Sequence, residues 1–299
     1  MQHYDVTLLT ESRYENPTRP DWYEQQILTE DGFVIAALES RGLRVKRVDW
    51  ASADFDWAST RLAVFRTTWD YFHRIGEFRA WLERAAAQTQ LLNPSELVRW
   101  NVDKRYLKDL ERQGVRIVPT ALIEQGETCH LESFFAYFGT QELVIKPCVA
   151  GTARHTYRVD RENVLERQAR LDALLSEESM LVQAFQQRVP AEGEVSLIVI
   201  GGAVRHAVLK LAKPGDFRVQ DDFGGTAHAC EASPAHCDLA MQALAACPQM
   251  PAYARVDIVT DNAGMPAISE LELVEPELFF RFNPAAAGLL AEEILKALA

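Results

Sequence analysis

Two neighbouring apolar segments near the C-terminal end of the chain carry acidic side chains between aliphatic ones. The first segment, 254–260, contains Asp257, and the second, 267–274, contains Glu270 and Glu272. Side chains two apart on a strand point to the same face of a sheet. An Asp-Asn-Ala-Gly turn joins the segments. The pattern therefore predicts an antiparallel pair of strands with one acidic face and one buried aliphatic face.

Three carboxylates on one face repel one another unless a cation neutralises them. Oxygen ligands at this density suit Mg²⁺, which proteins usually hold with a few carboxylates and with phosphate oxygens of a substrate. The alternative is a polar sheet face in contact with water. The metal site is the favoured interpretation because the same chain also supplies groups that suit phosphate.

Those phosphate-binding groups lie upstream of the acidic segments. Lys104 is expected at the start of a helix and Lys146 at the end of a strand, and the small residues of 148–153 follow directly. Backbone N–H groups in a loop of small residues can approach a phosphate closely. Further on, Arg218 lies between a Pro-Gly and a Gly-Gly turn, where a guanidinium can stabilise a transferring phosphoryl group or an oxyanion. A surface loop is the other interpretation of that segment.

The order of the expected elements indicates three parts. In the first third, short apolar segments alternate with helical periodicity, which predicts a parallel sheet covered by helices on both faces. The strands expected there are 6–9, 45–48 and 62–65, and the helices are 21–41 and 78–87. The step Asn93-Pro94 marks a boundary between lobes. The middle part is expected to have helices at 103–113 and 164–175 and strands at 115–118 and 143–145. The last part is expected to have strands at 180–183, 195–200, 203–210, 254–260 and 267–274, and a final helix at 285–298.

Charge and cysteine content exclude several classes of partner. The 299 residues include 31 Lys and Arg against 43 Asp and Glu, a net charge of −12. This balance argues against a nucleic-acid groove or an anionic membrane as the main partner. No apolar run reaches the roughly 18 residues of a membrane-spanning helix, and the first residues lack the pattern of a signal peptide. The five cysteines are scattered without a CxxC pair, so we expect a reduced, cytoplasmic protein.

Taken in order, the motifs of the chain resemble those of the ATP-grasp superfamily, and the match spans nearly the whole chain. The motifs are Lys104 in Trp-Asn-Val-Asp-Lys, Lys146-Pro before a loop of small residues, Gln183-Ala-Phe, Gly-Asp-Phe-Arg218 with Gly224-Gly225, and Asp257 with Glu270-x-Glu272. Within the superfamily the chain is similar to glutathione synthetase-like and D-alanine–D-alanine ligase-like enzymes. Three strings narrow the resemblance to a short bacterial group that includes D-cycloserine synthetase: Arg66-Thr-Thr-Trp-Asp-Tyr71, Arg99-Trp-Asn101 and Leu271-Glu-Leu-Val-Glu-Pro276.

The resemblance implies a role for each motif. The residues that would contact ATP are Lys104, Lys146, Gly151, Thr152, Gln183, Ala184, Phe185, Gln186, Glu194 and Lys210. Two Mg²⁺ ions, for which Mn²⁺ can substitute, would be held by Asp257, Glu270 and Glu272. The catalytic residue would be Arg218, which would stabilise the acylphosphate and the tetrahedral species that follows it. Candidate substrate contacts are Arg66, Trp69, Asp70, Gln220, Gly224, Gly225, Arg255 and Glu275.

The chain departs from the family pattern at two places. The family usually has Asn at the position of Glu272, so the charge of the metal site can differ. Its mobile loop is usually richer in glycine than residues 148–153 are.

Two further patterns suggest sites that we do not predict. One is a group of His and Cys residues whose spacing matches no familiar zinc site: His228, Cys230, His236 and Cys237. The other is Cys148, which has no adjacent base in the sequence that would make it a nucleophile.

We therefore expect an α/β protein with the three-lobed ATP-grasp fold. Its lobes would be an N-terminal parallel α/β domain at 1–95, a small central lid domain at 96–180 and a β-rich catalytic domain at 181–299. The expected activity is that of an ATP-dependent carboxylate–amine ligase. Such an enzyme would activate a small amino-acid-like carboxylate as an acylphosphate, form an amide or close a ring, and release ADP and phosphate.

Ring closure would include D-cycloserine formation from O-ureido-D-serine, a step of antibiotic biosynthesis. A non-catalytic ATP-binding regulatory protein and a phosphotransferase that uses the same fold are the alternatives. The expected partner is a small molecule, and a homo-oligomer is left open.

Overall fold

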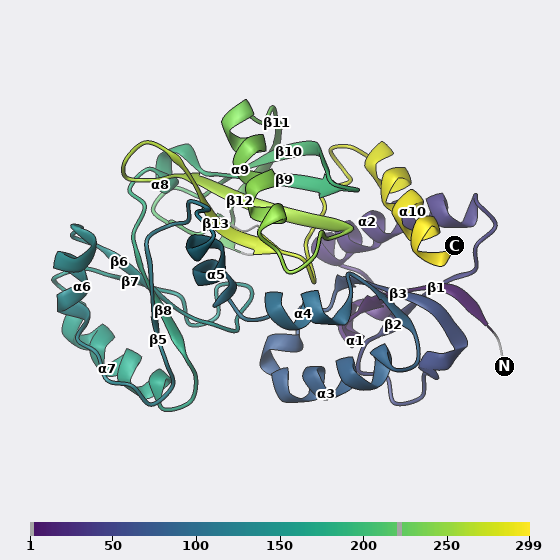
Figure 1. The fold of residues 1–299 in the computed structure, drawn as a ribbon, viewed down its shortest axis with the longest axis horizontal. Helices are drawn as coiled ribbons and strands as arrows, with labels where there is room; N and C mark the ends of the chain where they lie inside the picture. The colour runs from purple at the N-terminus through teal and green to yellow at the C-terminus, as the bar shows by residue number, and fades with distance from the viewer. Residues whose placement is uncertain (1–2, 220–222) are drawn as a thin grey trace.

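The computed structural model describes residues 3–219 and 223–299, which form three β-sheets with helices packed against them. Figure 1 shows the arrangement, with the sheet of the first residues at one side, the sheet of the middle residues at the other and the third sheet between and above them. Each sheet has its own helices, and the space where the three sheets meet contains the site described below.

The first sheet is parallel, as the alternation of strands and helices predicts. Its strands are β1 (Tyr4–Thr10), β2 (Val45–Asp49), β3 (Thr60–Thr67) and β4 (Gln90–Leu92), in the order β2-β1-β3-β4. Val6 and Leu8 of β1 pack toward α2 (Trp22–Glu39), while Leu9 faces α3 (Ile75–Ala86). Alternate side chains of one strand are thus buried on opposite faces, which is why this strand has a continuous apolar run. The short helix α1 (Ser12–Glu15) follows β1 directly.

The second sheet is antiparallel and belongs to the middle of the chain. Its strands are β5 (Thr120–Ile123), β6 (Leu143–Pro147), β7 (Tyr157–Val159) and β8 (Met180–Ala184), in the order β5-β8-β6-β7. The helices α6 (Leu131–Phe138) and α7 (Val164–Leu175) share one apolar cluster with this sheet. Because β8 pairs with β5 and β6, the central sheet extends four residues beyond the lobe boundary expected at residue 180.

The third sheet is antiparallel and carries the acidic hairpin. Its strands are β9 (Glu194–Ile200), β10 (Ala203–Leu211), β11 (Thr226–Cys230), β12 (Tyr253–Thr260) and β13 (Pro266–Glu272), in the order β11-β10-β9-β12-β13. One face packs against α9 (Pro234–Ala245) and against the pair α4 (Ser95–Asn101) and α5 (Tyr106–Arg112). The short helix α8 (Val189–Glu192) precedes β9.

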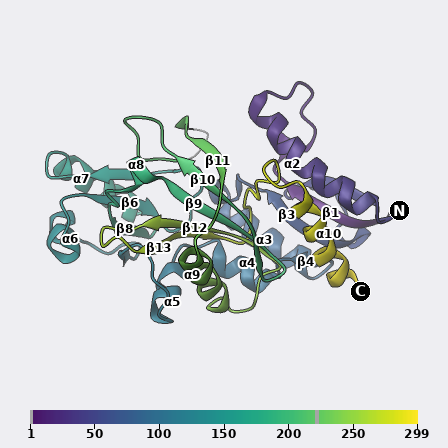
Figure 2. The ribbon, with the colours of Figure 1, turned by 90° about the horizontal axis from the view of Figure 1, so that it is seen from above.

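The last helix, α10 (Ala285–Leu298), returns to the first sheet. It packs beside α2 and shares a core with β1 and β3 and with β9 of the third sheet. Figure 2 shows α10 next to α2 at the N-terminal end of the molecule. The first and third sheets therefore share one hydrophobic core. Of the helices that the structure describes, none is both long and apolar enough to cross a membrane.

Two expected elements differ from those observed. The segment 115–118 is not a strand: it makes one parallel bridge, between Ile117 and Ile268, and its backbone then turns at Pro119. The helix expected at 103–113 begins only at Tyr106, because the preceding residues form a turn in which the N–H of Lys104 donates to the carbonyl of Cys148 at 2.7 Å.

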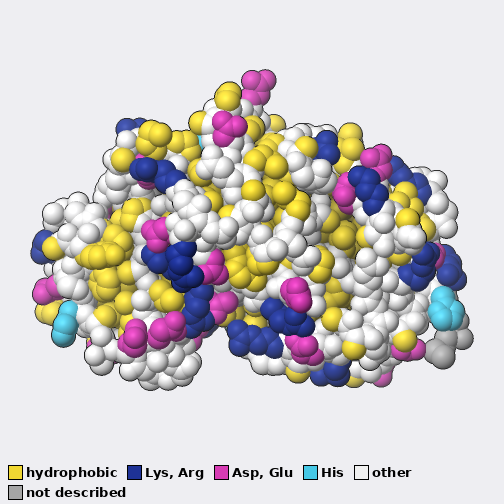
Figure 3. Space-filling model, in the orientation of Figure 1, with side chains coloured by type: hydrophobic (Ala, Val, Ile, Leu, Met, Phe, Trp, Pro, Cys, Tyr) yellow, Lys and Arg dark blue, Asp and Glu magenta, His cyan; other side chains and the backbone are white. Residues whose placement is uncertain are grey.

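Several short elements carry too weak a pattern to be read from the sequence: α4, α6, β5, β7 and β11. Strands such as β7, with three residues, are too short for a period of two to be recognised. Figure 3 shows Lys and Arg interspersed with Asp and Glu on the face it presents, so the excess of acidic groups does not form one continuous field there.

Candidate active site

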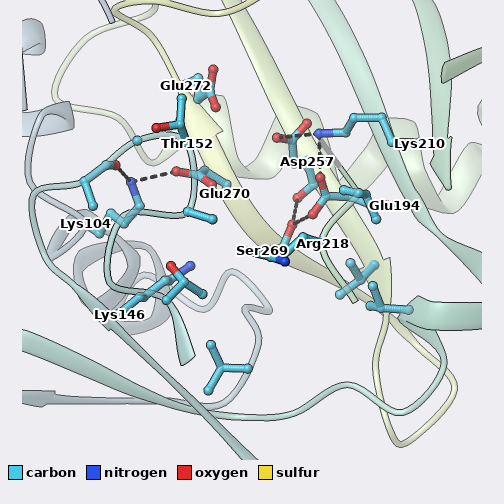
Figure 4. Close-up of a pocket in the computed structure, with 18 of the residues that line it drawn as sticks. Lys104, Lys146, Thr152, Glu194, Lys210, Arg218, Asp257, Ser269, Glu270 and Glu272 are labelled. Atoms are coloured by element: carbon cyan, nitrogen blue, oxygen red, sulfur yellow. Dashed lines mark hydrogen bonds and ion pairs between the residues drawn. The ribbon is translucent and has the colours of Figure 1, made fainter. Parts of the chain in front are cut away.

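A pocket lies where the three sheets meet, and residues of all three sheets line it. Lys146 comes from the end of β6 in the second sheet, Asp257 and Glu270 come from the third sheet, and Trp69 follows β3 of the first sheet. Figure 4 shows the lysines Lys104 and Lys146 on one side of the acidic hairpin and Lys210 on the other.

The acidic hairpin brings the three candidate metal ligands together. Asp257 of β12 lies opposite Glu270 of β13 in the strand register. Each of Asp257, Glu270 and Glu272 offers a carboxylate oxygen, and these oxygens lie within 4.8 Å of one another. The aliphatic residues between them face α9 and are buried in the core: Val256, Ile258, Leu271 and Leu273. The period of two thus places the acidic side chains in the pocket and the aliphatic ones in the core.

Each of these carboxylates contacts a cationic side chain. Lys104 Nζ lies 2.7 Å from Glu270, and Lys210 Nζ lies 3.2 Å from Asp257. Arg255 contacts Asp257 with its Nε and a terminal nitrogen, both at 3.0 Å, and the same terminal nitrogen also contacts Glu272. These partners satisfy buried charges that would otherwise be very costly.

The partners shift the pKa values of the carboxylates in opposite directions. Burial by itself would raise the pKa of Asp257, but Arg255 and Lys210 hold that pKa well below its usual range. At Glu270, burial also raises the pKa, but Lys104 and Lys146 lower it by more, so the pKa lies below its usual value. At Glu272, burial and the neighbouring carboxylates outweigh Arg255 and raise the pKa well above its usual value. Asp257 and Glu270 are therefore the more strongly ionised ligands.

Lys146 differs from the other pocket lysines because no carboxylate lies within 4 Å of its ammonium group among the described residues. Burial lowers its pKa; Glu270 opposes this lowering, and Lys104 partly offsets the effect of Glu270. By contrast, Lys104 also donates to the carbonyl of Ala150 at 2.6 Å, and its ion pair with Glu270 raises its pKa against the effect of burial. Lys146 is thus the lysine best placed to take an anionic ligand.

The loop after β6 closes over this part of the pocket. Gly151 and Thr152 line the pocket, as the family resemblance implies. Thr152 and Ala153 adopt positive φ angles of 45° and 54°, a conformation that costs free energy outside glycine. The backbone of Gly151 lies so close to the ring of Phe72 that an added Cβ would be 2.5 Å from a ring carbon. The loop is therefore held against the first sheet by contact.

The end of β8 and the residues that follow it line another part of the pocket. Gln183, Ala184, Phe185 and Gln186 all contribute to its wall. The side chain of Gln186 donates to the carbonyl of Ala184 at 2.7 Å, and Gln183 donates to Thr120 at 2.8 Å. Nearby, Glu194 accepts from Lys210 at 2.6 Å and from Ser269 at 2.7 Å. All ten residues expected to contact ATP therefore lie in one pocket.

Arg218 also lines the pocket, and its side chain is held on two sides. Its guanidinium contacts Asp216 through two nitrogens, at 3.0 and 2.7 Å, and lies 3.8 Å from the centre of the Phe223 ring. The contact with Arg218 keeps the pKa of Asp216 well below its usual range. These contacts hold the guanidinium of Arg218 in place at the wall of the pocket.

The candidate substrate contacts divide into three groups. Trp69, Arg255 and Glu275 line the pocket, and the indole N–H of Trp69 donates to the carbonyl of Glu275 at 2.9 Å. Asp70 lines an adjoining pocket and accepts from Trp50 at 2.6 Å. The glycines Gly224 and Gly225 are not among the lining residues, and Gln220 lies outside the described residues.

Arg66 is not in the pocket, contrary to the expectation from the sequence. Its side chain is 2% exposed and pairs with Asp31 of α2 at 3.0 Å. Arg66 lies on β3, and its side chain contacts α2 and the ring of Phe280. Arg66 therefore belongs to a buried ion pair between β3 and α2 and does not line the pocket.

The pocket also contains residues that the sequence patterns do not indicate. The largest are aromatic: Tyr23, Phe72, Phe217 and Phe279. Glu277 lines it too, two residues after Glu275, and continues the spacing of the acidic strand. The spacing of two residues is the sequence pattern from which Glu277 could have been predicted as a pocket residue. The aromatic residues come from separate segments, and no local pattern distinguishes them from core residues.

The two alternative sites remain unsupported. Among the described residues, the cluster of Asp257, Glu270 and Glu272 is the one group of three or more His, Cys, Asp or Glu side chains that could hold a metal ion. The His and Cys residues of 228–237 do not form another. Burial raises the pKa of the Cys148 thiol to about 12, so this group is not a thiolate near neutral pH.

Comparisons with known proteins match both parts of the chain. A family model described as the RimK-like ATP-grasp domain matches residues 103–272, and one described as the N-terminal domain of D-cycloserine synthetase DcsG matches residues 6–93. The chain is 30% identical over 284 residues to the cycloserine biosynthesis protein DcsG of Streptomyces lavendulae, which covers 89% of this chain and 92% of that protein.

Solved structures show the same likeness. The crystal structure of D-cycloserine synthetase DcsG has a TM-score of 0.88 at 28% identity and covers 98% of this chain and 99% of its own. D-alanine–D-alanine ligase from Bacillus anthracis has a TM-score of 0.66 at 15% identity, with 99% and 97% covered. At that identity the second likeness concerns the fold alone.

Proposed function

Since this chain belongs to the RimK-like ATP-grasp family, we propose that it activates a small amino-acid-like carboxylate as an acylphosphate and closes a ring on it. Family membership confirms the expected ATP-grasp fold and an ATP-dependent ligase activity, and the family uses ATP with Mg²⁺. The observation that carries the proposal is the convergence of Lys104, Lys146 and three carboxylates in one pocket, next to Arg218.

The donor set of the pocket fits Mg²⁺. Asp257, Glu270 and Glu272 offer only oxygen ligands, and these lie close enough to share a cation. We propose that these three residues hold two ions, which would bridge the protein to the phosphates of ATP and neutralise their charge.

In the first step, a carboxylate oxygen of the substrate attacks the γ-phosphorus of ATP. A C–O–P bond forms, the bond from the γ-phosphorus to its bridging oxygen breaks, and ADP leaves with that electron pair. Lys146 and Lys104 are positioned to hold the phosphates through charge-assisted hydrogen bonds.

In the second step, a nitrogen attacks the carbonyl carbon of the acylphosphate and forms a tetrahedral oxyanion. Arg218 is proposed to stabilise that charge with its fixed N–H groups. The oxyanion collapses, the C–O bond to phosphate breaks, inorganic phosphate leaves and the nitrogen loses a proton. The products are an amide bond, ADP and phosphate.

The atom balance of ring closure depends on which substrate is used. If the ureido nitrogen of O-ureido-D-serine attacked, the carbamoyl group would remain on the ring nitrogen. D-cycloserine has no such group, so ring closure on O-ureido-D-serine also requires water, which removes the carbamoyl group as ammonia and carbon dioxide, whereas O-amino-D-serine closes the ring without this step. The DcsG-like match over residues 6–93 supports this substrate class, because that part of the chain supplies Trp69 to the pocket.

Ligation of two separate molecules is the second candidate. The same acylphosphate could be attacked by a nitrogen of a second molecule, which is the kind of ligation that the name D-alanine–D-alanine ligase describes for a protein of the same fold. The complete set of carboxylates, lysines and Arg218 argues against the non-catalytic alternative, since a regulatory protein would not need Arg218. A phosphotransferase would release a stable phosphorylated product instead of phosphate.

Three finer points are also proposals. We propose that the lobe made by the first sheet selects the acid, that the lobe made by the second sheet acts as a lid over ATP, and that the protein works in the cytoplasm.

An ADP-release assay over four acids tests the function: O-amino-D-serine, O-ureido-D-serine, D-alanine and L-alanine, each with ATP and Mg²⁺. We expect O-ureido-D-serine or O-amino-D-serine to give ADP, phosphate and a cyclic product identified by mass spectrometry. ADP release with D-alanine and formation of a dipeptide would favour the second candidate. A phosphorylated acid that accumulates without ring closure would indicate the phosphotransferase, and no ADP with any acid would contradict the proposal.

A further inference from the structure

The guanidinium of Arg255 is hydrogen-bonded to two of the three candidate metal ligands. Its guanidinium donates two hydrogen bonds of 3.0 Å to Asp257 and contacts Glu272 with one of the same nitrogens. The side chain of Arg255 is 11% exposed and that of Asp257 is 2% exposed. These are therefore desolvated ion pairs, and the guanidinium lies where a cation bound between the two carboxylates would lie.

The strand register makes this contact a built feature of the hairpin. Arg255 of β12 and Glu272 of β13 are directly opposite each other, and Arg255 and Asp257 share a face because they are two residues apart on one strand. The same hairpin therefore supplies both the ligands and the cation that neutralises them.

Glu272 stands where the family usually has Asn. A carboxylate paired with a guanidinium is neutral as a unit, as an amide is. The pairing with Arg255 thus offsets the extra negative charge of Glu272 before any metal binds. Without Arg255, the pocket would hold an additional uncompensated carboxylate, which is costly when buried.

We propose that Arg255 is a resident counter-ion of Asp257 and Glu272 that a divalent cation displaces when it binds. This proposal rests on the proposed function, since it concerns the same metal site. Both oxygens of Asp257 and one oxygen of Glu272 now accept from Arg255, so a Mg²⁺ ion bound between these carboxylates competes with the guanidinium. Metal binding would free the guanidinium into the pocket, where the proposed reaction places an anionic acid.

The other cations of the pocket are less suited to this exchange. Lys104 and Lys210 each contact only one of the three candidate ligands. The planar fork of Arg255 holds two of them in a defined geometry, which a lysine ammonium cannot do. The ring of Phe279 also lies 6.0 Å from the guanidinium carbon and offers an aromatic face to the displaced cation.

Mn²⁺ affinity of the nucleotide-free protein tests the exchange, because it can be measured by electron paramagnetic resonance without any turnover. Arg255→Met removes the competing cation, and we expect Mn²⁺ to bind about tenfold more tightly or better, since a neighbouring opposite charge shifts carboxylate equilibria by about one to three decades. Glu272→Gln should weaken Mn²⁺ binding. The matched control is Arg116→Met, which removes an arginine paired with Asp261 at the turn of the same hairpin and should leave the Mn²⁺ affinity unchanged.

A second measurement follows Arg255 in the wild-type protein. Its side-chain Nε–H signal, assigned by its loss in Arg255→Lys, should shift when Mg²⁺ is added, which keeps the test valid if Arg255→Met does not fold. Unchanged or weaker Mn²⁺ binding in Arg255→Met, or an Nε–H signal that stays in place while metal binds, would overturn the proposal. An enzyme that releases no ADP but still shows the exchange would count against the proposed function only.

Discussion

At the scale of single residues, the pocket is a set of buried charges that neutralise one another. Glu270 is paired with Lys104, Asp257 with Lys210 and Arg255, and Glu194 with Lys210. Lys146 lacks such a partner among the described residues. A ligand with several negative charges can therefore be received at Lys146 without first breaking an ion pair, and a divalent cation must replace an internal cation.

The first prediction concerns Lys146. Lys146→Ala removes a charge-assisted contact, and such contacts contribute about 1.5–3 kcal/mol, so the dissociation constant of a non-hydrolysable ATP analogue should rise by roughly one to two decades. Calorimetric titration measures it. Lys296→Ala, at a lysine whose side chain is 70% exposed, is the control and should bind as the wild type does. An unchanged constant in Lys146→Ala would remove this lysine from the nucleotide site.

The second prediction concerns Arg218. If this residue stabilises charge that develops during the reaction, Arg218→Ala should lower kcat far more than it raises the KM for ATP. Loss of one preorganised donor typically costs about 10² to 10³ in kcat. Arg218→Lys keeps the charge but loses the fork that Asp216 orients, so it should restore only part of the rate. Steady-state kinetics with circular dichroism as a folding check decides. A loss confined to the KM for ATP would assign Arg218 to ground-state nucleotide binding.

At the scale of elements, the loop after β6 makes one very close contact with the segment that follows β3. The backbone of Gly151 lies against the ring of Phe72, which comes from the segment after β3 in another sheet. Positive φ angles at Thr152, Ala153 and His155 give the loop its sharp path. The loop thus reaches across to the first sheet at a position where no side chain fits.

The third prediction follows from that contact. In Gly151→Ala the new Cβ would lie 2.5 Å from a ring carbon of Phe72, so the loop must shift and both nucleotide affinity and kcat should fall. Phe72→Leu in the same chain should restore part of the loss, and a double-mutant cycle measures the coupling. Gly32→Ala, where an added Cβ meets nothing within 4 Å, is the control. Equal losses in Gly151→Ala with and without Phe72→Leu would show that the contact does not control the loop.

At the scale of the whole molecule, the first and third sheets share a core. Leu290 of α10 is fully buried with Val6 and Leu8 of β1 and with Ile198 of β9. Asn93, between β4 and α4, adds buried hydrogen bonds to the carbonyls of Tyr253 and Leu273. The two sheets are therefore coupled through this core and these hydrogen bonds.

The fourth prediction tests this coupling. Leu290→Ala should lower the free energy of unfolding by about 2–5 kcal/mol, the usual cost of a buried Leu→Ala change. Urea denaturation followed by fluorescence and by circular dichroism should shift both transitions together, because the core is shared. Leu165→Ala, at a side chain 79% exposed on α7, should change stability by no more than about 0.5 kcal/mol. Separate transitions in the two signals would contradict a shared core.

Features that depend on neighbouring residues could be predicted from the sequence. The period of two in 254–274 predicted the hairpin and its acidic face, and the observed register agrees with it. The helices at 164–175 and 285–298 were predicted with the observed bounds, because their periodic apolar positions span several turns. The order of motifs also predicted the ATP-grasp family, which the comparisons confirmed.

Contacts between distant segments depend on tertiary packing and could not be predicted from the sequence pattern. It placed Arg66 under the first sheet beside Asp31 rather than in the pocket, and assigned β8 to the second sheet. It also placed Arg255 across from Glu272, and Phe72 against Gly151. These relations join residues that are 17 to 79 positions apart, or depend on which strands pair with each other. Local periodicity predicts on which face of its own helix or strand a side chain lies. The residue that it contacts on that face depends on how the three sheets pack.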